Sequence, residues 1–187
     1  MPPFLPDNDA VRRDIAAQWT AWTRLDATLG ALLGEVPLDD ALVVLFSDNG
    51  IPFPSGKTNL AFEQGQREPL LISSPSQKTR GRRSDKVVGA LDFFPTILDW
   101  VGLGYPNATA GGAPAALSGA SLLPLLDGEG DASWRDSAFG SHQFHSLFCY
   151  YPSRSLVTSQ FRLVHNIAYD LKYRGGAETP LESGAEA

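Results

Sequence analysis

Two neighbouring side chains, Asp48 and Asn49, offer the clearest chemistry in the sequence. They follow residues 41–47, which read ALVVLFS, a continuous apolar and β-branched run typical of a buried strand. Ligands of open α/β sheets bind at the carboxyl ends of strands, where these two residues would stand. A carboxylate beside an amide oxygen suits a hard cation such as Ca²⁺ or Mg²⁺, but supplies only part of a shell, since Ca²⁺ takes about six to eight oxygens. The same Asp-Asn-Gly triplet is an ordinary turn signal, and the residues alone leave both interpretations open.

A lysine follows within reach of this pair. Lys57 stands in the sequence SGKTN, where its ammonium group could meet an anion held by the cation. The Gly-Lys-Thr order is similar to a piece of a phosphate-binding loop, but that pattern requires a glycine at position 51 and a strand just upstream. Position 51 is Ile51. We therefore exclude nucleotide binding of this type.

The histidines and the single cysteine are weaker candidates. His142 and His145 follow a candidate strand end, which is a common place for pocket residues, and loop histidines in partial contact with solvent explain them equally well. His165 lies in the strand-like stretch FRLVHNI and favours a structural role. Cys149 is interpreted as a small buried side chain, and one cysteine forms neither an internal disulfide nor a four-thiolate zinc site.

Helices and strands alternate around these residues. An amphipathic helix is predicted from residue 9, with Asp9 as its cap, to about residue 34, because apolar residues recur every three or four positions. They form one stripe that we expect to be buried: Val11, Ile15, Trp19, Trp22, Leu25, Leu29 and Leu32.

The rest of the chain divides into shorter segments. We expect a long loop at 50–68, a buried strand at 69–73, a basic solvated loop at 77–86, a helix at 92–101, a surface excursion at 103–119 and a helical turn at 121–126. Pro95 fits the helix only in its first turn. From residue 137 the pattern is typical of strands, with a hairpin around Ser159 and Gln160.

This order predicts an α/β fold, a doubly wound sheet that is incomplete at its N-terminal side and carries a small C-terminal antiparallel sheet. Residues 1–135 would form the first unit and 136–172 the second, followed by a disordered tail at 173–187. A sheet without its first strands exposes an apolar edge, so Leu42, Val44 and Phe46 would lack half their cover. We therefore expect the chain alone to be poorly soluble or molten.

Composition excludes several function classes. The 187 residues are 43% hydrophobic and 19% charged, which is typical of a globular protein. A net charge of −6 argues against binding a nucleic acid by charge alone. The longest purely apolar run has six residues, too few to span a membrane, and the N-terminus lacks the pattern of a signal peptide.

Several stretches resemble the sulfatase family. ALVVLFSDNGIPFPSGKTNL, REPLLISSP, LDFFPTILDW, SLLPLL and FRLVHN carry the resemblance, which covers roughly residues 1–170. IPFPSGKTN and the pair FGSH and YPSRS are most similar to the sulfamidases, which remove the N-linked sulfate from the ends of heparan sulfate. The resemblance implies an alkaline-phosphatase-like fold with a smaller C-terminal sheet.

The resemblance also implies roles for the candidate residues. Asp48 and Asn49 would be Ca²⁺ ligands, and Lys57 would contact the sulfate, where sulfamidases tend to carry arginine with its bidentate fork. His142 and His145 fall where sulfamidases have polar residues near the substrate. The full-length product would be a hydrolase of sulfated, heparan-type glycosaminoglycan. It would reach a lysosome-like compartment or the outside of the cell, often as a homodimer.

One essential family feature is missing from the sequence. Sulfatases use a formylglycine nucleophile made from the cysteine of C-x-P-S-R, whereas Cys149 stands in CYYPSR, one residue too long and far along the chain. We therefore expect no catalytic nucleophile in these residues, and interpret the chain as the middle and C-terminal part of a longer enzyme. Two alternatives stay open: an inactive remnant or interaction module, and a phosphatase or phosphonate hydrolase of the same superfold.

Overall fold

The computed structural model describes residues 1–53, 56–57, 59–104, 118–130, 132–144 and 150–171. Its helices are α1 (Asp9–Glu35), α2 (Phe93–Trp100) and α3 (Leu123–Leu126). Its strands are β1 (Val43–Phe46), β2 (Leu70–Ser73), β3 (Ser137–Phe144), β4 (Tyr150–Thr158) and β5 (Arg162–Asn166). The predicted tail and most of the predicted excursion at 103–119 lie outside the described residues. No described helix combines the length and apolarity needed to cross a membrane.

Helix α1 confirms the predicted helix and corrects its cap. Asn8, not Asp9, is the N-cap: its side-chain oxygen accepts a hydrogen bond from the Val11 amide at 3.0 Å. Asp9 is the first helical residue, where its charge interacts favourably with the helix dipole. The expected burial of the apolar stripe is wrong for this chain, because α1 has no buried residue and Trp19 and Trp22 are 65% and 53% exposed. The stripe has the right period, but Val11, Ile15 and Leu29 are only half-buried.

Strands β1 and β2 form a two-stranded antiparallel ribbon. Val43 pairs with Ser73 and Phe46 with Leu70. The apolar run predicted that β1 would be covered on both faces as in a parallel sheet. Its observed neighbour is antiparallel, and Phe46 stays 48% exposed. An apolar run shows that a strand needs cover, but it does not specify the direction of its partner.

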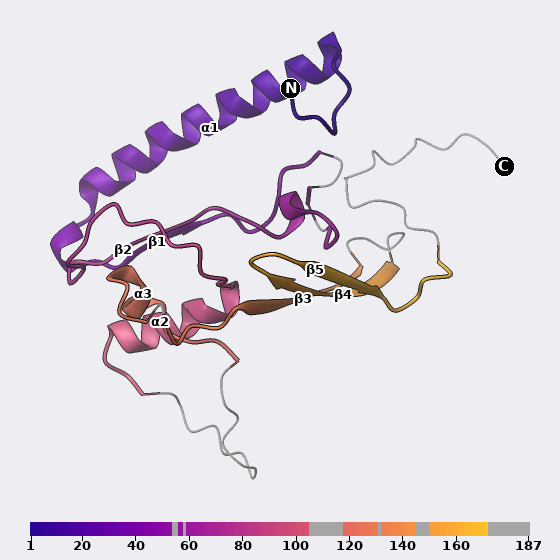
Figure 1. The fold of residues 1–187 in the computed structure, drawn as a ribbon. Coiled ribbons are helices and arrows are strands. Elements are labelled where there is room, and N and C mark those ends of the chain that lie inside the picture. The colour runs from indigo at the N-terminus through magenta and orange to yellow at the C-terminus, as the bar shows by residue number, and fades with distance from the viewer. Residues whose placement is uncertain (54–55, 58, 105–117, 131, 145–149, 172–187) are drawn as a thin grey trace.

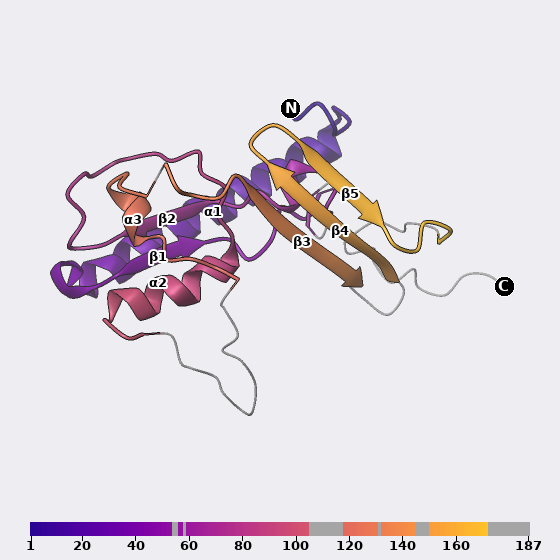
Figure 2. The same cartoon turned by 60° about the horizontal axis from the view of Figure 1, so that its bottom comes forward.

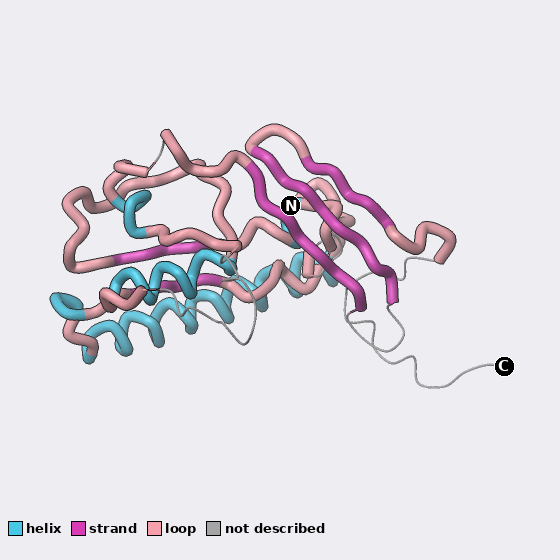
Figure 3. The backbone as a smooth tube through the Cα atoms, turned by 90° about the horizontal axis from the view of Figure 1, so that it is seen from below, coloured by secondary structure: helices cyan, strands magenta, loops and turns pink. Residues whose placement is uncertain are grey.

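Helices flank the ribbon on both sides. Figure 1 shows α1 on one side of β1 and β2 and α2 with α3 on the other; seen from below, the helices and the ribbon overlap (Figure 3). The rings of Phe46 in β1 and Phe93 in α2 lie 4.7 Å apart, which joins the ribbon to α2. Pro95 is the third residue of α2, as predicted, and is buried. The layers agree with the predicted α/β architecture.

A buried carboxylate joins α2 to the start of β3. Asp92 is fully buried and accepts hydrogen bonds from the Gly89 amide at 2.8 Å, the Ala120 amide at 3.0 Å and both terminal nitrogens of Arg135. Burial alone would raise the pKa of Asp92, but these donors outweigh it and hold the pKa below its usual value. Asp92 is therefore a charged anchor where the α/β layers meet the C-terminal strands.

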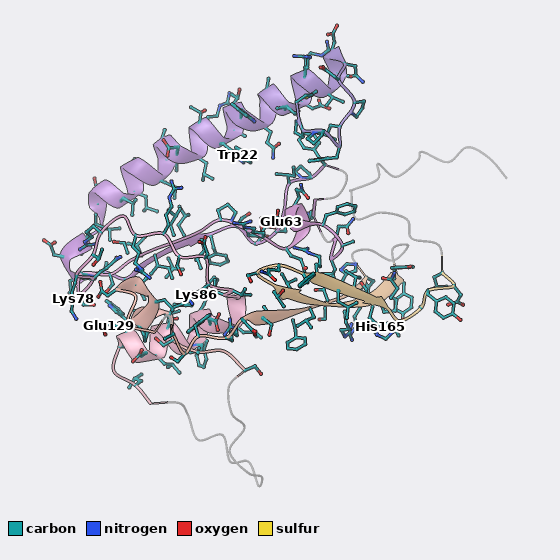
Figure 4. The ribbon with its side chains drawn as sticks, viewed as in Figure 1. Trp22, Glu63, Lys78, Lys86, Glu129 and His165 are labelled. Carbon is teal, nitrogen blue, oxygen red and sulfur yellow. The ribbon has the colours of Figure 1, made fainter. Side chains whose placement is uncertain are left out.

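The basic loop at 77–86 is attached to the segment after α3. The backbone amides of Lys78 and Thr79 donate to Asp127, and the Lys78 ammonium pairs with Glu129 at 2.8 Å (Figure 4). Both partners of the ion pair are well exposed, so solvent screens the pair and it contributes little to stability. The predicted loop is confirmed, and the backbone bonds to Asp127 fix its beginning.

Strands β3, β4 and β5 form the predicted C-terminal antiparallel sheet, in the order β3-β4-β5 (Figure 2). The predicted hairpin joins β4 to β5, and the Thr158 hydroxyl accepts from the amides of Gln160 and Phe161 in its turn. Phe139 and Leu163 lie on one face of the sheet and are 82% and 64% exposed. Much apolar surface is thus uncovered, and the buried hydrophobic residues among those described are Leu5, Leu122 and Leu125.

Candidate functional site

Asp48 and Asn49 leave the carboxyl end of β1 in a turn. The Asn49 side-chain amide donates to Asp48 Oδ1 at 2.8 Å, and the Ser47 hydroxyl donates to the Asn49 carbonyl oxygen at 2.8 Å. The triplet is thus a turn whose side chains also carry carboxylate and amide oxygens, so the two interpretations of the sequence are compatible.

The loop after this turn folds back tightly on itself. A Cβ on Gly50 would lie 1.8 Å from the Gln64 carbonyl oxygen, and one on Gly56 would lie 2.0 Å from the Ile51 carbonyl oxygen. Only glycine fits where two backbones approach so closely. The Lys57 amide donates to the same Ile51 oxygen at 2.9 Å. The fold therefore returns Lys57, which is half-buried, to the segment that directly follows Asp48 and Asn49.

Glu68 is a third acidic or amide side chain at this place, and sequence analysis missed it. The Ser47 amide donates to the Pro69 carbonyl oxygen at 3.3 Å, which extends the register of β1 and β2 by one pair. The next position sets Asp48 opposite Glu68. Burial raises the pKa of the Glu68 carboxyl, and the charge of Asp48 raises it further. The signal was a carboxylate two residues before β2, but recognising it required the antiparallel register.

The C-terminal sheet holds the far end of the loop. Gln66 donates its side-chain amide to Ser155 Oγ at 2.7 Å, and a Cβ on Gly140 would lie 2.2 Å from the same Gln66 nitrogen. Arg162 donates to the Phe62 carbonyl oxygen at 2.6 Å and to Gln66 Oε1 at 3.0 Å. All three strands thus contribute to one binding face for residues 60–66.

His142 belongs to the face that meets the loop. It stands two residues after Gly140 on β3, and successive side chains of a strand alternate between faces, so both lie on the same side. It is half-buried and pairs in register with the buried Ser153. His165 is exposed on β5 (Figure 4). His145 and Cys149 lie outside the described residues.

A separate hollow of about 420 Å³ lies beside the basic loop. Arg82, Arg83, Lys86, Trp134 and Arg135 contribute to its lining, and none of its lining residues belongs to segment 48–68. It is therefore distinct from the site around Asp48.

The donor set around Asp48 is compatible with a hard cation. Two carboxylates and one amide offer oxygen only, which is the preference of Ca²⁺ and Mg²⁺. Glu68 Oε1 is a buried oxygen without a hydrogen-bond partner among the described residues, so its lone pairs are available to a ligand. The described part of the chain contains no cluster of three or more His, Cys, Asp or Glu side chains able to hold a metal, so these residues alone would not complete a metal site.

Comparison with known proteins decides the family. The sulfatase family model matches residues 3–103, and the model of the C-terminal part of N-sulphoglucosamine sulphohydrolase matches residues 57–173. The chain belongs to the sulfatase family. This confirms the resemblance, and the sulfatase domain contains the candidate residues Asp48, Asn49 and Lys57.

Individual sulfatases agree with this assignment. The chain is 44% identical to human N-sulphoglucosamine sulphohydrolase over 92% of its length and 35% of the relative's. It is 32% identical to an N-acetylglucosamine-6-O-sulfatase of Bacteroides thetaiotaomicron over 75% of the chain and 26% of that relative. The chain thus spans about a third of the length of the sulfatases it matches.

A solved sulfatase structure supports the fold. The structure of a 2-O GAG sulfatase superposes with a TM-score of 0.59 at 21% identity, covering 78% of this chain and 31% of the other. The predicted alkaline-phosphatase-like fold class is confirmed. The correction to β1 concerns the direction of its neighbouring strand and does not change the fold class.

Proposed function

We propose that this chain is the middle and C-terminal part of an N-sulphoglucosamine sulphohydrolase-like enzyme that hydrolyses the sulfamide or sulfate groups of heparan-type glycosaminoglycan. The observation that carries the proposal is the placement of Asp48 and Asn49 at the carboxyl end of β1, joined through Ile51 to the loop of Lys57, in a chain 44% identical to that human enzyme.

Asp48 and Asn49 would hold part of a Ca²⁺ site. When bound, the ion would polarise the oxygens of the sulfate and so favour attack on sulfur. The chain's own contribution is to fix the ligands: β1 sets their position, the hydrogen bond between them orients the amide, and the close approach at Gly50 fixes the direction of the loop. A ligand set held rigidly loses little entropy when the cation binds.

Lys57 would pair with the negative charge of the sulfate. An ammonium group close to the sulfate stabilises the charge that grows during hydrolysis, and it acts as a point charge rather than as the fork that arginine would offer. His142, on the face of β3 that meets the loop, and His145 would border the sugar. These two histidines would set substrate selectivity rather than supply the nucleophile.

The nucleophile would come from another segment of a longer product. Sulfatases act through a formylglycine made in C-x-P-S-R, and these 187 residues contain no such sequence. We further propose that this product is a homodimer that reaches the lysosome or the outside of the cell. Residues 1–135 would complete its catalytic domain, and residues 136–172 would begin its C-terminal subdomain. Gel filtration with light scattering, and fractionation with an antibody to this chain, test these points.

The test is an assay of the endogenous protein, isolated with an antibody against this chain, on a fluorogenic N-sulfoglucosaminide. Release of inorganic sulfate that stops with a chelator and returns with Ca²⁺ is the expected result. Adding the 6-O-sulfated sugar and a phosphate monoester as competitors separates sulfamidase, esterase and phosphatase activities. Hydrolysis of the phosphate alone would overturn the proposal.

The absent nucleophile also favours a second function for the chain taken by itself. Without formylglycine, a protein of these 187 residues would be an inactive remnant or an interaction module, and its large exposed apolar surface is compatible with binding a partner. Hydrolysis of an aryl sulfate or sulfamide by the purified chain of this length would eliminate this alternative.

A further inference from the structure

Three arginines lie within four residues of the basic loop. Arg80, Arg82 and Arg83 give the order Arg-Gly-Arg-Arg, and Ser84 follows them. Successive side chains of an extended chain point to opposite faces, so the first two arginines would share one face and Arg83 would take the other. A protein that binds this stretch as a strand would need an acidic pocket for each arginine. Endopeptidases that cleave after clustered basic residues have such pockets.

The segment is open to a peptidase. Residues 80–85 are all exposed, and residues 82–89 belong to no helix or strand. Gly81 has a φ of +69°, and a Cβ at this position would meet nothing within 4 Å, so the backbone is uncrowded here. Exposed loops are preferred sites of proteolysis, and a peptide in extended form pairs with the edge of its receptor through main-chain hydrogen bonds. The segment can therefore enter the cleft of a peptidase while the neighbouring elements stay folded.

Contacts on both sides delimit the open stretch. Before it, the amides of Lys78 and Thr79 donate to Asp127 at 2.8 Å and 2.9 Å. After it, the Val87 carbonyl oxygen accepts a hydrogen bond from the indole nitrogen of Trp134 at 2.8 Å. The arginine cluster lies between these two anchors, so a peptidase would reach it without displacing either one.

We propose that the peptide bond between Arg83 and Ser84 is the cleavage site of an arginine-specific endopeptidase of the secretory route. The inference rests on the proposed destination of the product, since such peptidases act along that route. Arg83 would enter the pocket beside the bond that is cut, and Arg80 and Arg82 would enter two further acidic pockets, because the guanidinium fork pairs with carboxylates in a bidentate manner. The small side chain of Ser84 leaves the carbonyl carbon of Arg83 accessible.

The reaction is the addition of one water molecule across this bond. The bond from the Arg83 carbonyl carbon to the Ser84 nitrogen breaks, the carbon gains the hydroxyl group of water, and the nitrogen gains its proton. A further proton then passes from the new carboxyl group to the new amine. The products at neutral pH are a carboxylate at Arg83 and an ammonium group at Ser84.

The two pieces are expected to stay together after cleavage. Contacts that cross the cut include the hydrogen bonds of the loop to Asp127, the ring contact of Phe46 with Phe93, and the hydrogen bond of Gln66 to Ser155. The cut lies outside the candidate functional site. We therefore expect a two-chain protein that keeps its native mass and the activity of the uncut form.

The test is to express the full-length product in secreting cells and to separate the protein from cells and medium by denaturing electrophoresis. Two chains are expected, and N-terminal sequencing of the second should start at Ser84. Gel filtration without denaturant should give one particle of the same mass as the uncut form. Arg83→Ala should give a single chain. A wild-type protein that remains a single chain would overturn the inference.

Two variants separate recognition of the arginine cluster from nicking at any exposed basic residue. Protein made in the presence of a peptidase inhibitor is incubated with a purified endopeptidase specific for Arg-Xaa-Arg-Arg. Arg80→Ala is expected to slow cleavage about 10- to 100-fold, which is the effect of losing one contact between charged groups. Lys86→Ala, in the same loop but outside the cluster, is the matched control and should be cut at the wild-type rate. Equal rates in Arg80→Ala and the wild type would contradict recognition of the cluster.

Sulfate release from an N-sulfated glucosaminide, measured on the same samples, distinguishes this inference from the proposed function. A single chain with activity overturns the inference and leaves the proposed function standing. Two chains without activity support the inference and count against the proposed function. A single chain without activity overturns both.

Discussion

Gln66 donates its side-chain amide to the hydroxyl of Ser155 at 2.7 Å, across 89 residues of sequence. The bond joins the end of the Lys57 loop to the central strand of the C-terminal sheet, and Arg162 reinforces it from β5. The small sheet therefore acts as the support of the candidate site. Its contribution to function is expected to be mechanical, through the shape of the loop.

Removing Arg162 should release this loop. Arg162→Ala leaves the Phe62 carbonyl oxygen and Gln66 Oε1 without their charged donor, and the loss of such bonds is expected to cost about 1.5–3 kcal/mol. Hydrogen exchange should rise across residues 59–66. Arg154→Ala is the matched control, because Arg154 is exposed and donates to the carbonyl oxygen of the neighbouring Ser153. Equal exchange in the two variants would contradict the support role.

Replacing Lys57 should affect catalysis more than binding of the metal. In the full-length product, Lys57→Ala removes the cation that we propose to pair with the sulfate, and is expected to lower kcat/KM about 10²- to 10³-fold. Lys57→Arg keeps the charge and adds the bidentate fork, so it should retain activity. Steady-state kinetics on an N-sulfated glucosaminide measures both. Full activity in Lys57→Ala would exclude a role at the sulfate.

Breaking the Asp92–Arg135 pair should destabilise the fold severely. Arg135→Ala leaves a fully buried carboxylate with only its two backbone donors, and loss of one partner of a buried pair costs about 3–5 kcal/mol. Urea unfolding measures the loss. Lys78→Ala, which breaks the exposed pair with Glu129, is the control and should leave the free energy of unfolding almost unchanged.

The same pair predicts a pH dependence. The pKa of Asp92 is lower in the folded protein than in the unfolded chain, so the unfolded chain takes up a proton first as the pH falls. The stabilisation is fully present above the ordinary aspartate pKa of about 4 and disappears as the pH falls through the lower folded value. The pair is therefore intact at the mildly acidic pH of a lysosome. Urea unfolding between pH 3 and 7 measures this. In Asp92→Asn, the free energy of unfolding should fall less steeply as the pH is lowered than it does in the wild type.

The exposed apolar surface predicts the behaviour of the isolated chain. Trp19 and Trp22 on α1, Leu71 on β2 and Phe94 on α2 are all more than half exposed. A protein of these 187 residues should bind a hydrophobic dye, lack a sharp near-ultraviolet signal and associate on sedimentation. A cooperative melt from a compact monomer would contradict this prediction and the interpretation of the chain as part of a larger domain.

Local patterns in the sequence were sufficient for the helices and the hairpin. The period of the apolar residues predicts α1, the position of Pro95 predicts the first turn of α2, and the strand patterns around Ser159 predict the turn from β4 to β5. Each of these elements depends on residues close in sequence. The caps are less predictable, since Asn8 and Asp9 are both good candidates and only the geometry selects Asn8.

What the sequence does not predict depends on contacts between distant segments. The antiparallel partner of β1 begins 24 residues later, so neither its direction nor the position of Glu68 opposite Asp48 follows from the apolar run. The cover of α1 is likewise a property of neighbours, and none of its residues is buried here. Asp48, Asn49 and Lys57 could be proposed from the sequence because a family motif contains them. Which face of β3 bears His142 could be identified only from the close approach of Gln66 to Gly140.

The measurement that tests the account most directly is the intact mass of the endogenous protein, captured with an antibody against a peptide of this chain. The chain covers 35% of the human relative, so a complete enzyme should have roughly three times the mass of these 187 residues. Such a mass is the predicted result, with the formylglycine segment in the additional part. A mass equal to that of the 187 residues would contradict the account, because Asp48 and Asn49 would then belong to a site without a nucleophile.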